Sequence, residues 1–136
     1  MATFRLEILT PDRRFFDDQI EVLVFTGSEG EIGVMAGHIP MAAAIEAGPM
    51  HIKQNGDWKE IFSSDGFLSI INGTVRVLVQ TAEWPDEIDR RRAEEAIVRA
   101  NARIARQRSR SDIFRARASI ARALARIKVL NDTDHH

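Results

Sequence analysis

Two pairs of charged side chains in the second half of the sequence have the spacing needed to hold a phosphate chain. Asp89 and Arg92 lie three residues apart, and Arg122 and Arg126 lie four apart, so each pair would share one face of a helix. An antiparallel hairpin could bring both faces together, and guanidinium groups bind phosphate through charge-assisted hydrogen bonds. A simpler role fits the same residues: Asp89 favours the helix dipole and pairs with Arg92 or Arg90, while Arg122 and Arg126 face solvent.

The sequence carries no recognised catalytic pattern. It has no P-loop, no GxGxxG, no HExxH and no nucleophile elbow, and its four histidines are not at ligand spacing with acids. The lack of cysteine excludes disulfides and thiolate zinc sites. We therefore predict no catalytic residue, no metal site and no required cofactor. His135 and His136 end a polar tail, which we expect to be a disordered terminus.

A glycine-dense segment covers residues 27–40. Glycine permits positive φ angles and close backbone approach, so we predict a shaped loop here. In structural terms it would be a tight turn followed by a β-bulge. In functional terms, Glu29 and Glu31 at its tip would contact another subunit.

The elements that position these residues differ between the two halves of the chain. In the first half, apolar residues alternate with polar ones over 4–8 and 20–24, which is the period of a β-strand. Asn55-Gly56 and Asn72-Gly73 each separate two such runs and predict two-residue hairpins. Adjacent strands should therefore be antiparallel, and several short strands without helical period indicate a small sandwich in preference to a flattened barrel.

The period changes to that of a helix after Trp84. A first helix is predicted to start near Pro85, and residues 107–111 break the pattern before a second helix capped by Ser111 or Asp112. The predicted seam is narrow, so the hairpin must dock on another surface, which suits a switch. Its apolar members are Ala93, Ala96, Ile97, Ala100 and Ile104, facing Ile113, Ile120, Leu124 and Ile127.

The predicted fold is therefore an N-terminal antiparallel β-sandwich over residues 1–84, followed by a C-terminal antiparallel two-helix hairpin with a polar tail over 85–136. Residues 1–83 contain six Lys/Arg against twelve Asp/Glu, whereas residues 84–136 contain thirteen against eight. The basic half is thus better suited to grip an acidic partner. No secretion signal or membrane-spanning run is apparent, and a reducing cytoplasm fits the composition.

Nucleic-acid binding is the alternative function, because twelve arginines fall within residues 90–126. Acids at Glu94, Glu95 and Asp112 interrupt them, and Phe114 is the only aromatic residue in the predicted helices. We therefore expect no nucleic-acid partner for the preferred function, and the alternative is an arginine-rich adaptor that binds nucleic acid or another acidic partner.

One segment resembles a known signature. Residues Glu29–Pro40 read EGEIGVMAGHIP, which is similar to the EGE-x-G-x-x-x-GH-x-P pattern of the epsilon subunit of the bacterial F-type ATP synthase. Ala36 stands where the family commonly has proline, and Arg90, Arg91 and Arg92 are denser in charge than in many relatives. Further matches follow in family order at Thr10–Asp12, Gly66–Leu68, Ile88–Ala93 and Arg122–Val129.

This resemblance implies a non-catalytic subunit of the rotating central stalk that couples proton-driven rotation to ATP synthesis. The sandwich would bind the gamma subunit and rest on the ring of c subunits, with Glu29, Glu31 and His38 at the contact. The helices would extend into the catalytic head and inhibit ATP hydrolysis, where Arg115, Arg117 and Arg122 would face an acidic loop of the beta subunit. The expected location is peripheral, on the cytoplasmic face of the bacterial plasma membrane, without insertion.

The resemblance also implies a regulatory ligand. Ile88-Asp89-x-x-Arg92-Ala93 resembles the I/L-D-x-x-R-A motif with which some relatives hold ATP when the helices are folded down. Glu83, Arg122 and Arg126 match further positions used there. The implied site is therefore Glu83, Ile88, Asp89, Arg92, Arg122 and Arg126, and it would sense ATP without hydrolysing it.

Overall fold

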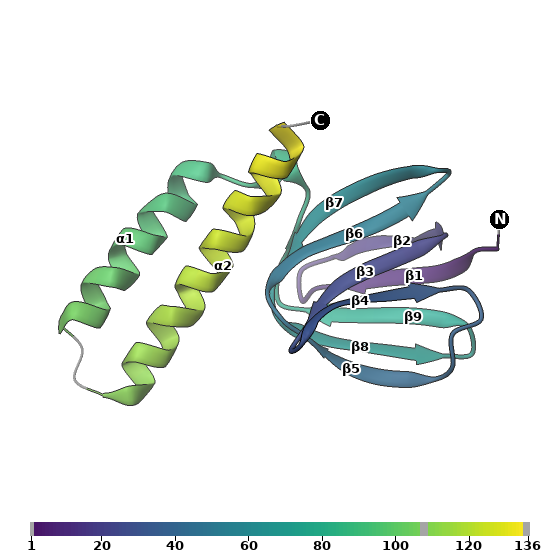
Figure 1. The fold of residues 1–136 in the computed structure, drawn as a ribbon, viewed down its shortest axis with the longest axis horizontal. Helices are drawn as coiled ribbons and strands as arrows, with labels where there is room; N and C mark the ends of the chain where they lie inside the picture. The colour runs from purple at the N-terminus through teal and green to yellow at the C-terminus, as the bar shows by residue number, and fades with distance from the viewer. Residues whose placement is uncertain (1, 107–108, 135–136) are drawn as a thin grey trace.

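The computed structural model describes residues 2–106 and 109–134, and it places two stacked β-sheets beside a helical hairpin (Figure 1). The first sheet, called sheet A, has the strand order β2-β1-β9-β8-β5, and the second, sheet B, has the order β10-β7-β6-β3-β4. The predicted sandwich followed by a two-helix hairpin is confirmed. The strands are β1 (Phe4–Leu9), β2 (Arg14–Ile20), β3 (Val22–Gly27), β4 (Gly30–Met35), β5 (Met41–Ile45), β6 (Gly48–Gln54), β7 (Asp57–Ser63), β8 (Gly66–Ile71), β9 (Thr74–Val79) and β10 (Ala82–Glu83).

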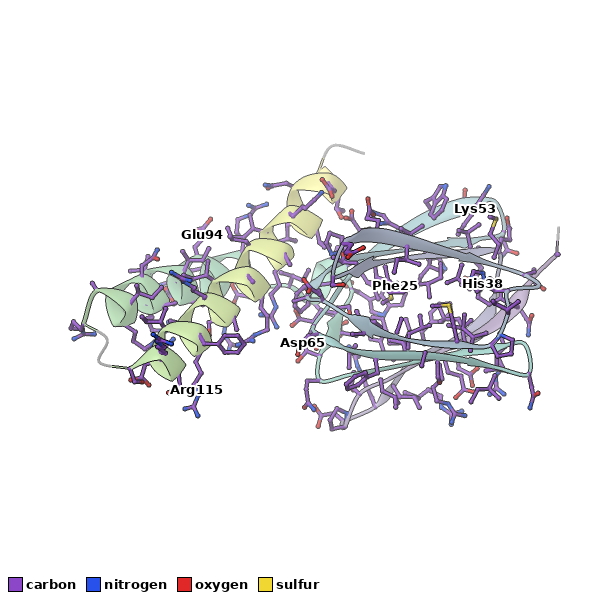
Figure 2. All side chains as sticks on the ribbon, turned by 60° about the horizontal axis from the view of Figure 1, so that its bottom comes forward. Phe25, His38, Lys53, Asp65, Glu94 and Arg115 are labelled. Carbon is purple, nitrogen blue, oxygen red and sulfur yellow. The ribbon has the colours of Figure 1, made fainter. Side chains whose placement is uncertain are left out.

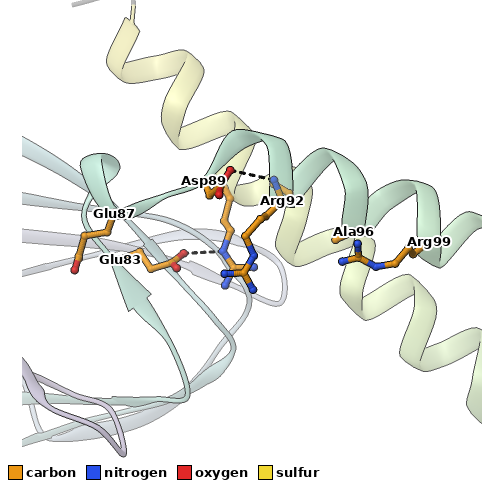
Figure 3. A pocket seen from close by; sticks show the side chains of 8 residues that line it. Glu83, Glu87, Asp89, Arg92, Ala96 and Arg99 are labelled. Carbon is orange, nitrogen blue, oxygen red and sulfur yellow. Dashed lines mark hydrogen bonds and ion pairs between the residues drawn. The ribbon is translucent and has the colours of Figure 1, made fainter.

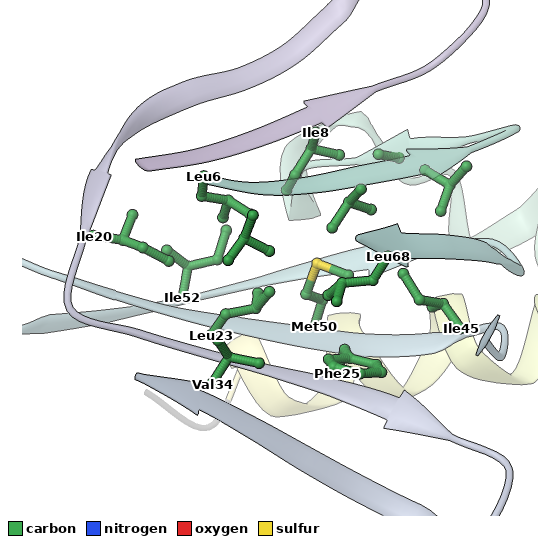
Figure 4. Packing of buried hydrophobic residues seen from close by; sticks show 14 of the residues in the cluster. Leu6, Ile8, Ile20, Leu23, Phe25, Val34, Ile45, Met50, Ile52 and Leu68 are labelled. Atoms are coloured by element: carbon green, nitrogen blue, oxygen red, sulfur yellow. The ribbon is translucent and has the colours of Figure 1, made fainter. Parts of the chain in front are cut away.

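The core of the sandwich lies between the two sheets (Figure 4). It forms because alternate residues of each strand point inward, so that a half-apolar strand supplies one continuous apolar face. On β1 this inward set includes Leu6 and Ile8, and on β3 it includes Leu23 and Phe25, all of them fully buried. The alternation seen in the sequence therefore identifies the core-facing residues of β1. Over residues 20–24 the predicted phase is wrong, because Leu23 faces the core while the valines on either side of it are only half-buried.

Both predicted two-residue hairpins are present. Asn55 and Gly56 have φ angles of 52° and 81°, and Asn72 and Gly73 have φ angles of 53° and 76°. Two consecutive positive φ angles define the type I′ turn, whose twist matches the strands that it joins. The pairs β6–β7 and β8–β9 are accordingly antiparallel.

Two features of the sandwich differ from the prediction. The glycine-dense segment is not one loop, because residues 30–35 form β4, paired with β3 from Val22↔Met35 to Gly27↔Gly30. Ile32 and Val34 alternate with more exposed neighbours there, which is strand periodicity that the glycines obscure. Strands β1 and β9 pair in parallel, since the two ends of the sandwich sequence meet inside sheet A.

The first helix begins later than predicted, and the second begins earlier. Residues Pro85–Glu87 form a single 3₁₀ turn, η1, and helix α1 runs over Arg90–Arg106. Helix α2 covers Arg110–Asp134, and the Oγ of Ser109, not Ser111 or Asp112, accepts the N-terminal N–H bond from Asp112 at 3.2 Å. Part of the predicted break, residues 107–108, lies outside the described residues, as do His135 and His136.

Small side chains form the contact between α1 and α2. Ala93 and Ala100 on α1, and Ala116 and Ala123 on α2, are buried and lie seven residues apart within each helix. Ile113, Ile120 and Ile127 are half-buried along the same side of α2. Leu124, which was predicted for this seam, is 53% exposed, because its position lies beyond the edge of the alanine face.

The hairpin docks on the outer face of sheet B through α2, which packs across β6 and β7 (Figures 1 and 2). Among the described residues, no helix packs extensively against sheet A. The docking contact is a small apolar cluster, separate from the sandwich core. We call it the docking cluster, and it consists of Phe62, Ile88, Ala125 and Val129, with Leu130 packed against them.

Candidate functional site

A pocket of about 210 Å³ opens where the end of the sandwich meets the two helices (Figure 3). Strand β10, the η1 turn, the start of α1 and the middle of α2 all contribute to it. Three carboxylates and three guanidinium groups share the wall, so the site combines cation and anion partners in one small volume. The lining residues are Glu83, Glu87, Asp89, Arg92, Ala93, Ala96, Arg99 and Arg126.

Arg126 is held across the pocket by two interactions. Its Nε donates to Oε1 of Glu83 at 2.6 Å, and both side chains are about three-quarters buried. Its guanidinium also lies 4.3 Å from the centre of the Phe62 ring. A cation that stacks on an aromatic face and pairs with a carboxylate is well ordered. The strand end and α2 are thereby tied together at the pocket.

Asp89 caps helix α1. Its Oδ1 accepts a hydrogen bond from the backbone N–H of Arg92 at 3.1 Å, which is the bond expected of an N-cap residue. Asp89 therefore bonds to the Arg92 backbone and leaves the Arg92 side chain directed to the pocket (Figure 3). The helix-start role and the pocket-lining role are thus both compatible with the geometry.

Two of the six predicted nucleotide-site residues do not line the pocket. Ile88 is 8% exposed and belongs to the docking cluster, and Arg122 donates from Nη2 to the Oγ of Ser119 at 3.2 Å. Conversely, Arg99 lines the pocket although it was not predicted. Its signal in the sequence is its spacing: it lies seven residues after Arg92, so the two share one face of α1.

The η1 turn that leads into the pocket is fixed to the sandwich. The Arg13 guanidinium donates to both carboxylate oxygens of Glu87, at 2.9 and 3.0 Å, and the backbone N–H of Trp84 also donates to Glu87. These bonds hold the pKa of Glu87 below its ordinary value. The Trp84 ring stacks on Phe15 at 4.8 Å between centroids. The floor of the pocket is therefore preorganised by contacts with β2 and the β1–β2 turn.

The predicted subunit-contact residues lie in three separate places. Glu29 is exposed in the β3–β4 turn and Glu31 is exposed near the start of β4, whereas His38 is exposed in the β4–β5 loop at the far end of the sandwich (Figure 2). Arg115 and Arg117 are exposed on α2. The interpretation of residues 27–40 as one loop that carries both Glu31 and His38 is therefore wrong, because Glu31 belongs to strand β4 and His38 to the loop after it.

The outer face of sheet A carries an apolar row. Phe67 and Leu78 are directly opposite each other on β8 and β9, and they are 69% and 49% exposed. Leu9 pairs with Leu78 on the next strand, and Ile71, 62% exposed, lies on the same face of β8. Large apolar side chains grouped on one open sheet face are typical of a protein-binding surface.

Among the described residues, no group of histidine and acidic side chains is arranged to hold a metal ion. Within the same residues no helix is both long and apolar enough to cross a membrane.

The same architecture occurs in solved structures of rotary ATP synthases. One chain of the OSCP/F1/c-ring structure of the Euglena gracilis mitochondrial ATP synthase superposes with a TM-score of 0.79 at 19% identity, covering 100% of this chain and 83% of that chain. A chain of the central stalk/c-ring structure from Tetrahymena thermophila gives a TM-score of 0.64 at 12% identity, covering 93% and 95%. At these identities the likeness defines the fold.

The family is shown by the sequence comparisons. Residues 3–85 match the beta-sandwich domain of the ATP synthase delta/epsilon chain, and residues 86–131 match its long alpha-helix domain. The ATP synthase epsilon chain of Ruminiclostridium cellulolyticum is 43% identical over 131 residues, which are 96% of this chain and 98% of that one. The epsilon chain of Caldanaerobacter subterraneus is 41% identical over 128 residues, 93% of each chain.

This chain therefore belongs to the ATP synthase delta/epsilon chain family. The resemblance stated from the sequence is confirmed, and the chain is a non-catalytic, epsilon-type subunit of the ATP synthase.

Proposed function

We propose that this chain couples rotation to ATP synthesis within the central stalk, and that its helical hairpin restrains ATP hydrolysis by leaving the sandwich. The observation that carries the proposal is the construction of the docked hairpin. Among the described residues, four buried side chains make up the docking cluster, while the sandwich has its own separate core. An element held by so small a contact can detach without unfolding the domain that carries it.

The sandwich supplies the proposed contacts with the stalk. The apolar row of Phe67, Leu78 and Ile71 faces outward on sheet A, on the side that the hairpin leaves open, and would be the surface that binds the gamma subunit. The exposed Glu29, Glu31 and His38 would contact the c-ring and gamma from the two ends of the sandwich. The peripheral position on the cytoplasmic face of the bacterial membrane follows from these partners.

The detached hairpin would present a basic surface to the acidic loop of the beta subunit. Arg115 and Arg117 are already exposed on α2, and Phe114 and Leu124, 76% and 53% exposed, offer apolar area beside them. Arg122 is half-buried in the docked form, so detachment would add it to this surface. Charge complementarity of this kind orients association, and burial of the apolar side chains would hold it.

The test is ATP hydrolysis by the assembled complex. Deletion of residues 86–136 should leave assembly intact and raise the hydrolysis rate. Replacing Arg115, Arg117 and Arg122 together by Gln should reproduce part of that rise, most clearly at low salt, where screening is weakest. Equal rates for the intact, truncated and neutralised complexes would reject inhibition by the hairpin.

We also propose ATP as a regulatory ligand of the docked hairpin, bound in the pocket and not hydrolysed. Arg92, Arg99 and Arg126 converge on it from two helices, and guanidinium groups are suited to a phosphate chain. Arg99→Ala or Arg126→Ala should weaken ATP binding by about 1.5–3 kcal/mol, the value of a charge-assisted hydrogen bond. Arg103→Ala, on α1 but away from the pocket, is the matched control.

Isothermal titration of the isolated chain with ATP measures these affinities directly. No heat from the unmodified chain at millimolar ATP would reject the nucleotide site. An Arg103→Ala loss as large as that of Arg99→Ala would show that general charge, and not the pocket, binds the nucleotide.

A further inference from the structure

Five charged or titratable side chains meet where the last turns of α2 cross sheet B. Glu60 on β7 lies opposite His51 on β6, and Glu31 reaches His51 from β4, with 3.9 Å between its carboxylate and Nδ1. From above, α2 contributes Lys128 and Asp132. The Glu60 side chain is only 11% exposed. The outer edge of the docked hairpin therefore rests on a buried carboxyl group.

The Glu60 carboxyl group has few hydrogen-bond donors around it. Its Oε1 is buried and accepts no hydrogen bond within the described chain, although Nε2 of His51 lies 3.3 Å away. A buried carboxylate without donors is strongly disfavoured, whereas a protonated carboxyl group needs fewer partners and can donate one bond itself. The surroundings of Glu60 therefore favour its neutral form.

Asp132 is the acceptor for that proton. Asp132 acts on the Glu60 carboxyl group from α2, and because two ionised carboxylates close together repel each other, the protonated form of one of the pair is favoured. Lys128 Nζ lies 3.1 Å from Oδ2 of Asp132 and keeps that group ionised, so the proton resides on Glu60. Burial in the first place, and then Asp132, raise the pKa of Glu60 to about 7, while the pKa of Asp132 is lowered.

We propose that the Glu60–Asp132 pair is a proton-dependent clasp that holds the hairpin on the sandwich. The proposal concerns docking within the isolated chain, so it does not depend on inhibition or on nucleotide binding. Docking of α2 on β7 would be coupled to the uptake of a single proton, which stabilises the docked form.

The direction of the pH effect follows from linkage. In the open form Glu60 would lie on an exposed sheet face, where its ordinary pKa of 4.5 applies. The docked form therefore holds one more proton between about pH 4.5 and 7. The clasp contributes fully at pH values below this window and is lost as the pH rises through about 7. Between pH 6 and 8 the opening constant should increase about tenfold.

The absence of cysteine from the sequence allows a direct assay on the full chain. Ala125→Cys places a thiol in the docking cluster, where the residue is 8% exposed, and Ala121→Cys places one on an exposed position of the same helix. The ratio of their modification rates by a small thiol reagent measures hairpin opening. Because both rates contain the intrinsic pH dependence of thiol reactivity, this dependence cancels in the ratio. The ratio therefore reports hairpin opening even when the open form is rarely populated.

Three variants assign the effect. With Glu60→Gln, which is permanently neutral, the ratio should be the same at pH 6 and 8. Asp132→Asn should reduce the pH dependence, because the proton loses its acceptor. Glu31→Gln, the matched charge change on the same face, should keep most of the tenfold rise, because Glu31 makes the smallest of the contributions that raise the pKa of Glu60. His51→Gln, which tests the other protonatable group of the cluster, should keep it as well.

Two results would overturn the clasp. One is a ratio that changes less than twofold from pH 6 to 8 in the unmodified background. The other is a rise that persists in Glu60→Gln or disappears in His51→Gln. Circular dichroism of each variant establishes that the sandwich is folded, and titration of the Glu60 carboxyl carbon by NMR gives an independent measure of its pKa.

Discussion

Replacing Phe62 by alanine should detach the hairpin while leaving the sandwich intact. Phe62 is fully buried, yet it points away from the sandwich core, and its neighbours Ile88, Ala125 and Val129 all come from the helical part of the chain. Its burial is thus a property of docking. Truncation of a buried phenylalanine costs about 3–5 kcal/mol, and the stacked Arg126 loses its aromatic partner in addition.

That loss corresponds to an increase of roughly two to nearly four powers of ten in the hairpin opening constant, levelling off once the hairpin is fully free. Amide hydrogen exchange followed by mass spectrometry resolves the effect along the chain. Peptides from α2 should lose protection, whereas those from β1, β8 and β9 should keep it. Phe67→Ala, which removes an exposed phenylalanine from sheet A, is the control and should change neither.

The reasoning would be refuted if the strands of both sheets lost protection together with α2. Phe62 would then support the sandwich itself. Unchanged protection of α2 would equally refute it, because the docking cluster could not then be what holds the hairpin.

Two further substitutions test the local structure. Asp89→Ala should destabilise the hairpin by about 1 kcal/mol through loss of the N-cap bond to the Arg92 backbone, whereas Asp89→Asn should retain most of that stability. Urea unfolding monitored by circular dichroism compares the two variants with the unmodified chain. Equal stability of the three proteins would reject the capping role of Asp89. Gly66→Ala should destabilise the sandwich by about 1–3 kcal/mol or more, because a Cβ there would overlap the Leu78 carbonyl oxygen. Gly33→Ala is the control, because a Cβ at that position has no neighbouring atom within 4 Å. Thermal unfolding measures the stability of both variants, and an unchanged stability of Gly66→Ala would contradict the packing.

The sequence predicts the sandwich well because its signals are local. Asn55-Gly56 and Asn72-Gly73 specify their turns through backbone geometry alone, and period two identifies the inward residues of β1. It gave the wrong phase in β3, where Leu23 faces the core and its apolar neighbours on both sides make the alternation ambiguous. Strand β4 was missed since glycines at 30 and 33 weaken the same period. The parallel pairing of β1 with β9 joins residues about 70 positions apart, and no local pattern encodes it.

The candidate site was only partly predictable for a related reason. Asp89 and Arg92 were found through their spacing on one helix, and Arg99 could have been found in the same way. Arg122 was misplaced because the rotation of α2 about its axis is set by the docking cluster and by the alanine face toward α1. The Glu60–Asp132 contact likewise depends on where α2 lands on sheet B, which only the tertiary structure reveals.

The attachment of the η1 turn determines how the hairpin could move. Trp84 stacks on Phe15, and Glu87 is bound by Arg13, so the chain is anchored to the sandwich up to residue 87. Any swing must therefore pivot at Ile88 and Asp89, directly before α1. Helix α1 has 17 residues and a length of about 25 Å. A rotation at these two backbone positions would therefore displace the far tip of the hairpin, about 25 Å away, much more than the base of α1.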